Sequence, residues 1–228
     1  MTEPVDVIAI DGPAGSGKST VAKSIARTLD WDYIDTGAMY RCICLKAIRN
    51  NIGFDEEEKL VEELEETTMR MTFEDGELRV YMDGQDVSRD IRQNQVSKHV
   101  SEVAQLPKVR ENLVEKQRDM GRRGGVVMDG RDIGTVVFPN ARYKFFLDAS
   151  LEIRARRRYN ELREKGQEVE FESVVEEIKD RDETDRKRSE SPMKPADDAI
   201  HVDTSDKSVE DVVDTLLDAV EEKRHSEP

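Results

Sequence analysis

The chain has few cysteines: Cys42 and Cys44 are the only two among its 228 residues. They lie two positions apart in a segment that we predict to be helical, where alternate side chains point apart and do not readily form a disulfide. Two thiols alone also make a poor metal site. We therefore expect both cysteines to be reduced, partly buried side chains without a chemical role.

Long apolar runs and a basic surface are also lacking. No apolar run approaches the length of a membrane span, and Met1-Thr2-Glu3-Pro4 lacks the basic-then-apolar pattern of a signal peptide. The formal net charge of -15 argues against nucleic acid as the main partner, because phosphate backbones need a broad basic surface. We expect a cytoplasmic protein that binds neither membranes nor nucleic acid. A small anionic substrate needs only a few local arginines, so it remains compatible with this charge.

The length permits one substantial core with a small inserted lobe. Apolar β-like segments alternate with helical ones, which is typical of a parallel sheet covered by helices. We predict core strands over 5–10, 32–34, 125–128, 143–147 and 200–202, and helices over 19–29, 38–50, 107–120, 151–165, 171–183 and 209–223. Ser208 and Asp211 resemble a capping box at the start of the last helix.

The stretch Met69–Val87 departs from this rhythm. Its apolar residues recur every second position, and two Asp-Gly pairs, Asp75-Gly76 and Asp83-Gly84, predict turns. A helix over 56–67 precedes it. We therefore predict a small antiparallel lobe, inserted between the second and third core strands and covering 56–103.

The most informative segment is Gly12-Pro13-Ala14-Gly15-Ser16-Gly17-Lys18-Ser19-Thr20, which fits the pattern G-x-x-x-x-G-K-[ST]. It lies between a predicted strand and a predicted helix, so its backbone N–H groups and the helix N-terminus can surround an anion. An exposed Lys18 can reach the outer phosphates of a nucleoside triphosphate, and the Ser19 hydroxyl can ligate Mg²⁺. A chance glycine-rich turn is disfavoured because strand, loop and helix agree. The segment predicts binding of ATP or GTP.

Polar groups follow two further strands. The strand over 125–128 ends in Asp129-Gly130-Arg131-Asp132-Ile133-Gly134, and the strand over 32–34 leads into Asp35-Thr36-Gly37-Ala38-Met39-Tyr40-Arg41. Ligands bind at the carboxyl ends of strands in open parallel sheets. One polar turn alone is equally well explained as a strand cap, but two such turns favour a binding site.

Arginines are dense in the second half of the chain. Arg154, Arg156, Arg157 and Arg158 share one predicted helix, and Arg181, Arg186 and Arg188 lie among Asp180, Asp182 and Asp185. Such a run is usually a solvated face with intrahelical ion pairs, and Arg181 with Asp185 alone fits an exposed pair of this kind. A phosphotransferase, however, needs mobile arginines that close on the transferred group. We therefore assign some of them to a site.

A GTPase is disfavoured, since the chain has no N-K-x-D guanine-reading motif and no catalytic glutamine after the strand ending at Asp129. A helicase or motor would be larger and more basic.

Four segments together resemble the bacterial cytidylate kinases, a family of P-loop nucleoside monophosphate kinases. They are Gly12–Thr20, Asp35–Arg41, Asp129–Thr135 and the pattern Arg181-Asp182-x-x-Asp185-x-x-Arg188, and the resemblance covers nearly the whole chain. It implies one kinase domain over 1–228. That α/β P-loop fold has three layers and a five-stranded parallel sheet, with a nucleotide-monophosphate lobe over 56–103 and a short helical lid over 154–188. The implied reaction is phosphoryl transfer from ATP to CMP or dCMP with Mg²⁺, and we expect a monomer.

The resemblance also implies roles for individual residues. Thr36, Arg110, Asp132 and Arg188 would face the cytosine, Ser101, Arg181 and Asp185 the sugar, and Arg41 and Arg131 the monophosphate. Tyr40 belongs to the same acceptor site, and Arg157 and Arg158 to the lid over ATP. Catalysis would rest on Lys18, Arg131, Arg157, Arg158 and Arg188, and the metal on Ser19.

The chemistry of cytosine agrees with this assignment. A carboxylate such as Asp132 can accept a hydrogen bond from the N4 amino group, whereas uracil presents a carbonyl there. An unpaired buried polar group costs about 1–3 kcal/mol, which is enough for a sizeable preference. Two alternatives stay open: a kinase for another acceptor such as UMP or AMP, and a nucleotide-dependent switch that binds without transfer.

Overall fold

The computed structural model describes residues 3–74, 76–164, 166–188 and 190–226. Within them, five strands form a parallel sheet in the order β2-β6-β1-β7-β8. They are β1 (Val5–Asp11), β2 (Asp32–Asp35), β6 (Val126–Gly130), β7 (Ala141–Asp148) and β8 (Ile200–Asp203). Because all five run in one direction, the polar segments that follow β1, β2 and β6 lie at one edge of the sheet. The predicted fold class is confirmed.

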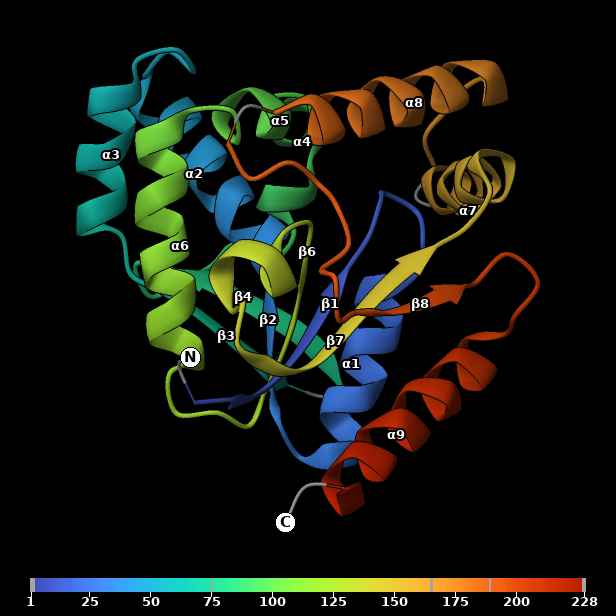
Figure 1. Cartoon of the computed structure of the whole chain (residues 1–228). Helices are drawn as coiled ribbons and strands as arrows, with labels where there is room; N and C mark the ends of the chain where they lie inside the picture. Colours follow the sequence, from blue (N-terminus) through green and yellow to red (C-terminus); the bar gives the residue numbers. More distant parts are fainter. Residues whose placement is uncertain (1–2, 75, 165, 189, 227–228) are drawn as a thin grey trace.

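Helices cover both faces of this sheet (Figure 1). Those described are α1 (Lys18–Leu29), α2 (Thr36–Asn50), α3 (Glu57–Glu66), α4 (Asn94–Ser97), α5 (Val100–Val103), α6 (Pro107–Gly121), α7 (Leu151–Glu164), α8 (Phe171–Lys187) and α9 (Val209–Ser226), with a 3₁₀ turn η1 (Asp90–Arg92) and a π turn η2 (Ile133–Val137). Helix α1 packs against α9, and α6 packs against α3 and η2. Helices α7 and α8 lie beyond the carboxyl ends of the strands (Figure 1).

The core is centred on β1, in which Val7, Ile8, Ala9 and Ile10 are all buried. A central parallel strand is covered on both faces, so it reads as a continuous apolar run and not as an alternating one. Burying a side chain such as Ile10 stabilises the fold by about 1.5–3 kcal/mol. The central strand thereby fixes the position of the loop that leaves its carboxyl end.

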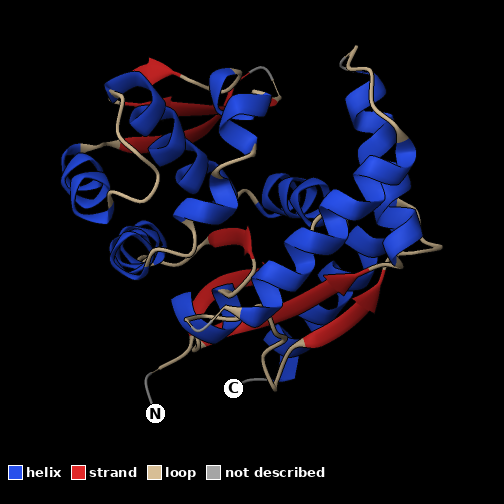
Figure 2. Cartoon of the chain, turned by 90° about the horizontal axis from the view of Figure 1, so that it is seen from above, coloured by secondary structure: helices blue, strands red, loops and turns tan. Residues whose placement is uncertain are grey.

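A second, antiparallel sheet contains β3 (Met69–Glu74), β4 (Glu77–Met82) and β5 (Gln85–Asp86). It is a separate sheet (Figure 2) that lies between β2 and β6 in the chain, and β3 contacts β2 through the stacked rings of Phe73 and Tyr33, whose centres are 6.1 Å apart. The alternation seen in the sequence holds, because Leu78, Val80 and Met82 are buried. The predicted antiparallel unit is therefore confirmed, although β5 is too short for periodicity to reveal. Asp75 of the predicted turn lies outside the described residues.

Several boundaries differ from the prediction. Helix α2 begins at Thr36, two residues early, because the Asp35 carboxylate caps it by accepting a 2.9 Å hydrogen bond from the N–H of Ala38. Helix α8 continues to Lys187, four residues beyond its predicted end. The predicted capping box of α9 is confirmed, because Ser208 and Asp211 exchange hydrogen bonds between side chain and backbone. Lys165, where the predicted helix over 151–165 ends, lies outside the described residues.

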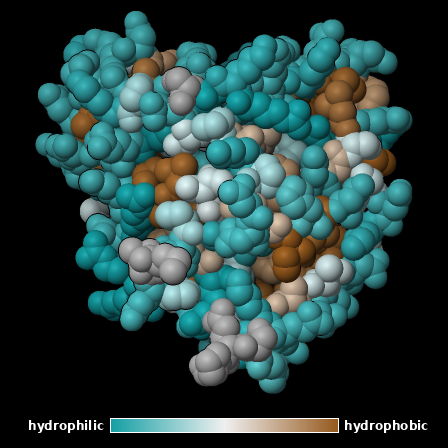
Figure 3. Space-filling model, in the orientation of Figure 1, coloured by the Kyte–Doolittle hydropathy of each residue, from teal (hydrophilic) through white to brown (hydrophobic). Residues whose placement is uncertain are grey.

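The cysteines are more deeply placed than expected. Cys42 and Cys44 are both fully buried and unbridged, and burial raises the pKa of each thiol to about 12. No described helix combines the length and the hydropathy that a bilayer span requires. The face shown in Figure 3 is mostly hydrophilic, in keeping with 38% charged residues.

Candidate functional site

The loop between β1 and α1 requires glycine at three positions. Gly12, Gly15 and Gly17 have φ values of 147°, 77° and 88°, which side chains rarely adopt. A Cβ at Gly12 would lie 2.0 Å from the carbonyl oxygen of Leu147, and one at Gly15 would lie 2.9 Å from that of Arg154. The loop is thus held between the end of β7 and the start of α7.

Helix α1 presents its N-terminus to this loop. Gly17 caps the helix, and the first turn contains no acidic residue that would neutralise the positive end of the helix dipole. The Ser16 hydroxyl is buried without a hydrogen-bond partner among the described residues. The backbone of residues 12–20 can therefore receive an anion.

Lys18, the first residue of α1, is not the exposed loop residue that we predicted. It is only 6% exposed, and its ammonium group donates a 2.9 Å hydrogen bond to the carbonyl oxygen of Pro13. Burial, together with the nearby Arg131 and Arg181, lowers the pKa of Lys18 to about 7. Because the loop buries the lysine, the charged form of Lys18 is unfavourable until an anion binds nearby.

This pKa predicts that nucleotide binding takes up a proton. At about pH 8 the free Lys18 is largely neutral, and a bound triphosphate favours the ammonium form, so binding should take up close to one proton. Calorimetric titration with a non-hydrolysable ATP analogue, in buffers of different ionisation enthalpy, measures this number. Lys18→Arg does not titrate and should show no such uptake. Equal proton uptake by both proteins would contradict the prediction.

Asp129, at the carboxyl end of β6, faces the same loop. One of its carboxylate oxygens accepts a 2.7 Å hydrogen bond from the Ser19 hydroxyl, and the other accepts a 2.6 Å bond from the Tyr33 hydroxyl. The residue is buried, and burial raises its pKa. The sequence alone predicts Asp129 at a strand end but gives it no role in the site. Its place on the strand beside β1 was the signal that could have identified it.

Asp132 and Arg110 form a buried ion pair of 2.8 Å. Burial raises the pKa of Asp132, and the Arg110 guanidinium opposes this shift. The guanidinium lies 5.6 Å from the centre of the Tyr40 ring. The Tyr40 hydroxyl is buried and has no hydrogen-bond partner in the described part of the chain. An orphan buried hydroxyl is unfavourable, so the group is available to a polar ligand.

Asp185 lies in a buried network, which excludes the alternative of a merely exposed ion pair with Arg181. It is 1% exposed, its Oδ2 accepts a 2.8 Å bond from Nε of Arg131, and Arg188 binds its Oδ1. Burial acts to raise the pKa of Asp185, but Arg131 and Arg188 hold it below its ordinary value. The helix face carrying Asp185 is therefore turned inward.

Arg181 and Arg41 leave positive charge unbalanced at this site. Neither makes a hydrogen bond or ion pair with another described residue, and Nε of Arg181 is buried without a partner. Burial and the charges of Arg131 and Arg41 lower the pKa of Arg181 to about 9. Cations that crowd together in this way favour an anion between them.

The remaining predicted residues lie around this cluster. The Thr36 hydroxyl donates a 2.8 Å bond to the carbonyl oxygen of Asp129. Arg157 donates to the hydroxyl and carbonyl of Thr204, at 3.0 and 2.6 Å, and approaches the carbonyl of Gly15 at 3.5 Å. Arg158 instead pairs with Glu161 on its own helix. Ser101 is half-buried on α5, which packs against α8. The structure thus joins Arg157, but not Arg158, to the loop.

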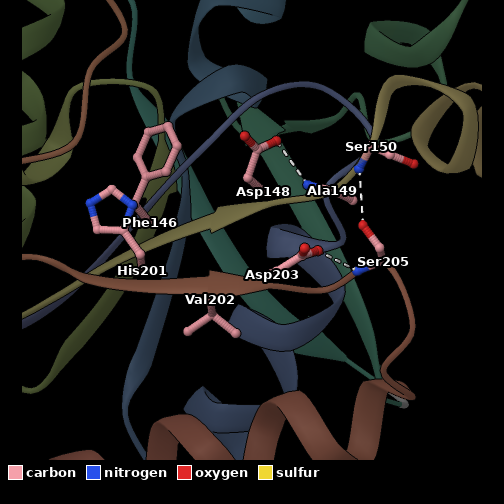
Figure 4. A pocket seen from close by; sticks show the side chains of 8 residues that line it. All are labelled: Phe146, Asp148, Ala149, Ser150, His201, Val202, Asp203 and Ser205. Atoms are coloured by element: carbon pink, nitrogen blue, oxygen red, sulfur yellow. Dashed lines mark hydrogen bonds between the residues drawn. The ribbon is translucent and has the colours of Figure 1, made fainter.

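A separate cavity of about 350 Å³ lies at the ends of β7 and β8 (Figure 4). Its lining comprises Phe146, Asp148, Ala149, Ser150, His201, Val202, Asp203 and Ser205. No residue predicted for the site is among them, and the imidazole of His201 is exposed. We assign no ligand to the outer cavity.

The family model described as cytidylate kinase matches residues 8–222. The chain is 54% identical over 220 residues to a cytidylate kinase of Caldanaerobacter subterraneus, covering 96% of each chain. It is 49% identical over 217 residues to one of Bacillus subtilis, covering 95% of this chain and 96% of the relative. A solved structure of an uncharacterized protein from Eubacterium ventriosum has a TM-score of 0.50 at 14% identity, covering 95% of this chain and 98% of that one. The latter likeness shows the fold alone.

Proposed function

The chain belongs to the cytidylate kinase family, and from this membership we propose which of its residues perform the reaction. It transfers the γ-phosphate of ATP to CMP or dCMP, giving ADP and CDP or dCDP. The observation that carries the residue assignment is the arrangement at one sheet edge. There an anion-receiving loop adjoins a buried cluster of arginines and aspartates.

The donor nucleotide occupies the loop Gly12–Thr20 in this proposal. Lys18 exchanges its bond with the Pro13 carbonyl for bonds to the outer phosphates, which restores its full charge. Arg157, already against the loop through Gly15 and Thr204, adds positive charge from α7. Arg158 joins the donor site by leaving Glu161, in keeping with its proposed place in the lid.

Mg²⁺ fits the pair formed by Ser19 and Asp129. A hydroxyl and a carboxylate 2.7 Å apart are hard oxygen donors of the kind that Mg²⁺ prefers, and it commonly takes its other ligands from phosphates and water. The Tyr33 hydroxyl fixes the orientation of the carboxylate. When bound, the ion supplies neutralising charge to the phosphates. Ser19 and Asp129 would hold the ion at the loop that also carries Lys18.

The acceptor nucleotide occupies the cluster in this proposal. Asp132 accepts from the cytosine amino group, and Arg110, Arg188 and Thr36 complete the base site, with the free Tyr40 hydroxyl beside them. Asp185, Arg181 and Ser101 surround the sugar. Arg41 and Arg131 bind the phosphate. The charge left unbalanced on Arg41 and Arg181 supports an anionic acceptor.

No general base is needed for this transfer, because the attacking phosphate oxygen is already anionic. His99 stacks on Phe54 at 4.0 Å and pairs with Glu102, and His201 lines the outer cavity, so neither imidazole belongs to the cluster. The protein contributes positioning and charge stabilisation by Lys18 and the arginines.

We also propose that the chain acts as a monomer in the cytoplasm. Every residue assigned to the two nucleotide sites comes from the same chain, so no partner is needed to complete them. The substrates are intracellular metabolites, and both cysteines are free thiols.

A side-by-side acceptor screen tests the assignment. The purified protein should release ADP from ATP at a substantial rate only when CMP or dCMP is present, because cytosine presents an amino donor to Asp132 at the position where uracil presents a carbonyl. ADP formation is measured with CMP, UMP, AMP and GMP in turn, and without any acceptor. A higher rate with UMP would indicate another acceptor, and a rate independent of any acceptor would indicate a switch.

A further inference from the structure

We propose that the buried ion pair between Arg154 and Asp182 couples the two nucleotide sites, so that a bound donor strengthens binding of the acceptor. The inference rests on the acceptor site proposed above, and neither residue has a role in that site. Arg154 lies on α7 and Asp182 on α8, with 2.6 Å between guanidinium and carboxylate. Their side chains are only 5% and 6% exposed. The pair is therefore shielded from water and from salt.

Arg154 is fastened to the phosphate-binding loop. Its Nε donates a 2.9 Å bond to the carbonyl of Ala149, and one terminal nitrogen donates a 3.1 Å bond to the carbonyl of Ala14 within the loop. Its backbone also lies so close to Gly15 that no Cβ fits there. Only the planar fork of arginine can serve two carbonyls and a carboxylate together. The orientation of this guanidinium therefore follows the position of the loop.

Asp182 lies on the helix that carries the acceptor residues. It precedes Asp185 by three positions, so these two aspartates lie near one another on the helix surface, and it follows Arg181 directly in the chain. Its Oδ2 binds Arg154, and its Oδ1 is buried with no hydrogen-bond partner among the described residues. Arg154 thus provides the ion pair that compensates the burial of Asp182. Helices α7 and α8 lie together beyond the strand ends, as Figure 1 shows.

These contacts form one mechanical path from donor to acceptor. A triphosphate that orders the loop fixes the Ala14 carbonyl, this fixes the Arg154 guanidinium, and the guanidinium sets the position of α8. Helix α8 then presents Arg181 and Asp185 at the acceptor site. Coupling between sites is reciprocal, so the acceptor must strengthen donor binding by the same factor. Energetic couplings of this kind typically change affinity by about 5–150-fold.

Calorimetry with the full chain tests this proposal. CMP is titrated with and without a saturating non-hydrolysable ATP analogue and Mg²⁺, and the ratio of the two affinities is the coupling factor. We expect a factor of about five or more for the native protein, and a factor within about twofold of one for Asp182→Asn. The affinity of Asp182→Asn for the analogue alone should remain within about threefold of native, because Asp182 contacts no loop atom. Asp180→Asn, an exposed aspartate on the same helix, should keep the native factor.

Two results would overturn the proposal: a native coupling factor of one, or an unchanged factor in Asp182→Asn. If the pair only supported the fold, its loss would weaken CMP binding by the same factor with and without the ATP analogue. The ratio of the two CMP affinities, which is the coupling factor, would then not change. Arg154→Lys keeps the buried charge but cannot bond Ala14, Ala149 and Asp182 at once, so it decides the matter if Asp182→Asn fails to fold. It should abolish coupling, and a native factor in that variant overturns the proposal. Failure of the native protein to bind CMP would instead contradict the acceptor site.

Discussion

Lys18→Ala is expected to lower the kcat for CMP phosphorylation by about a thousandfold or more, since donors and cations aimed at developing charge carry effects of this size. The side chain lies inside the loop and is held by the Pro13 carbonyl, so it is already near the position where phosphates bind. Its charge is weakened by burial and by Arg131 and is restored by the nucleotide. The measurement is kcat with saturating ATP, CMP and Mg²⁺.

The same substitution should leave the fold intact. In the free protein the Lys18 ammonium is buried near Arg131 and Arg181, and its lowered pKa means that the charged form opposes folding. This unfavourable contribution is fully present below about pH 7, and it diminishes as the pH rises from about 7, the folded pKa, toward the ordinary value of 10.5. The Tm of Lys18→Ala should therefore match or exceed the native value in acid solution. Lys23→Ala, on the same helix but outside the loop, should keep activity. Near-native turnover by Lys18→Ala would remove the basis of the donor-site assignment.

Local pattern predicted the parts of the site that depend on a few consecutive residues. The loop at Gly12–Thr20 could be predicted because three glycines, a lysine and a serine at this fixed spacing are typical of a phosphate-binding loop. The turn after β6 is visible because a buried strand ends there in charged residues. Parallel strands bring such ends to one edge, so the meeting of both turns follows from the strand and helix pattern alone.

Long-range pairing explains what was missed. Ser19 and Asp129 are 110 positions apart, and Arg131 and Asp185 are 54 apart, so no local pattern reveals that they bind each other. The same limit explains why the sequence left an exposed pair of Arg181 and Asp185 open as an alternative: residues 179–187 of the helix are all polar, and only the tertiary network shows which face turns inward. The π turn at η2 also escaped prediction, because the Asp11 carboxylate holds it by accepting from the N–H groups of Ile133 and Gly134.

The preference for cytosine over uracil should depend on Asp132. Its carboxylate is buried beside Arg110. When ionised it accepts hydrogen bonds but cannot donate them, so it attracts an amino group and repels a carbonyl. Removing it should lower the ratio of kcat/KM for CMP to that for UMP by about 5–150-fold, which corresponds to about 1–3 kcal/mol. The decisive quantity is this ratio, because a general loss of folded protein lowers both rates equally and cancels from it.

The choice of substitution matters because the ion pair is buried. Asp132→Ala leaves the Arg110 guanidinium buried without its partner, and breaking one side of such a pair typically costs about 3–5 kcal/mol of stability. Asp132→Asn keeps an oxygen for Arg110 and adds an amide donor that can serve the uracil carbonyl. It should therefore shift preference toward UMP with the smaller loss of Tm. Asp119→Asn, an exposed aspartate paired with Arg122, is the matched control and should keep the native ratio. An unchanged ratio in both Asp132 variants, with folded protein confirmed by melting, would show that another residue reads the base. Arg188 would then be the next to test, because its guanidinium lies at the same cluster and can donate to the ring acceptors of either pyrimidine.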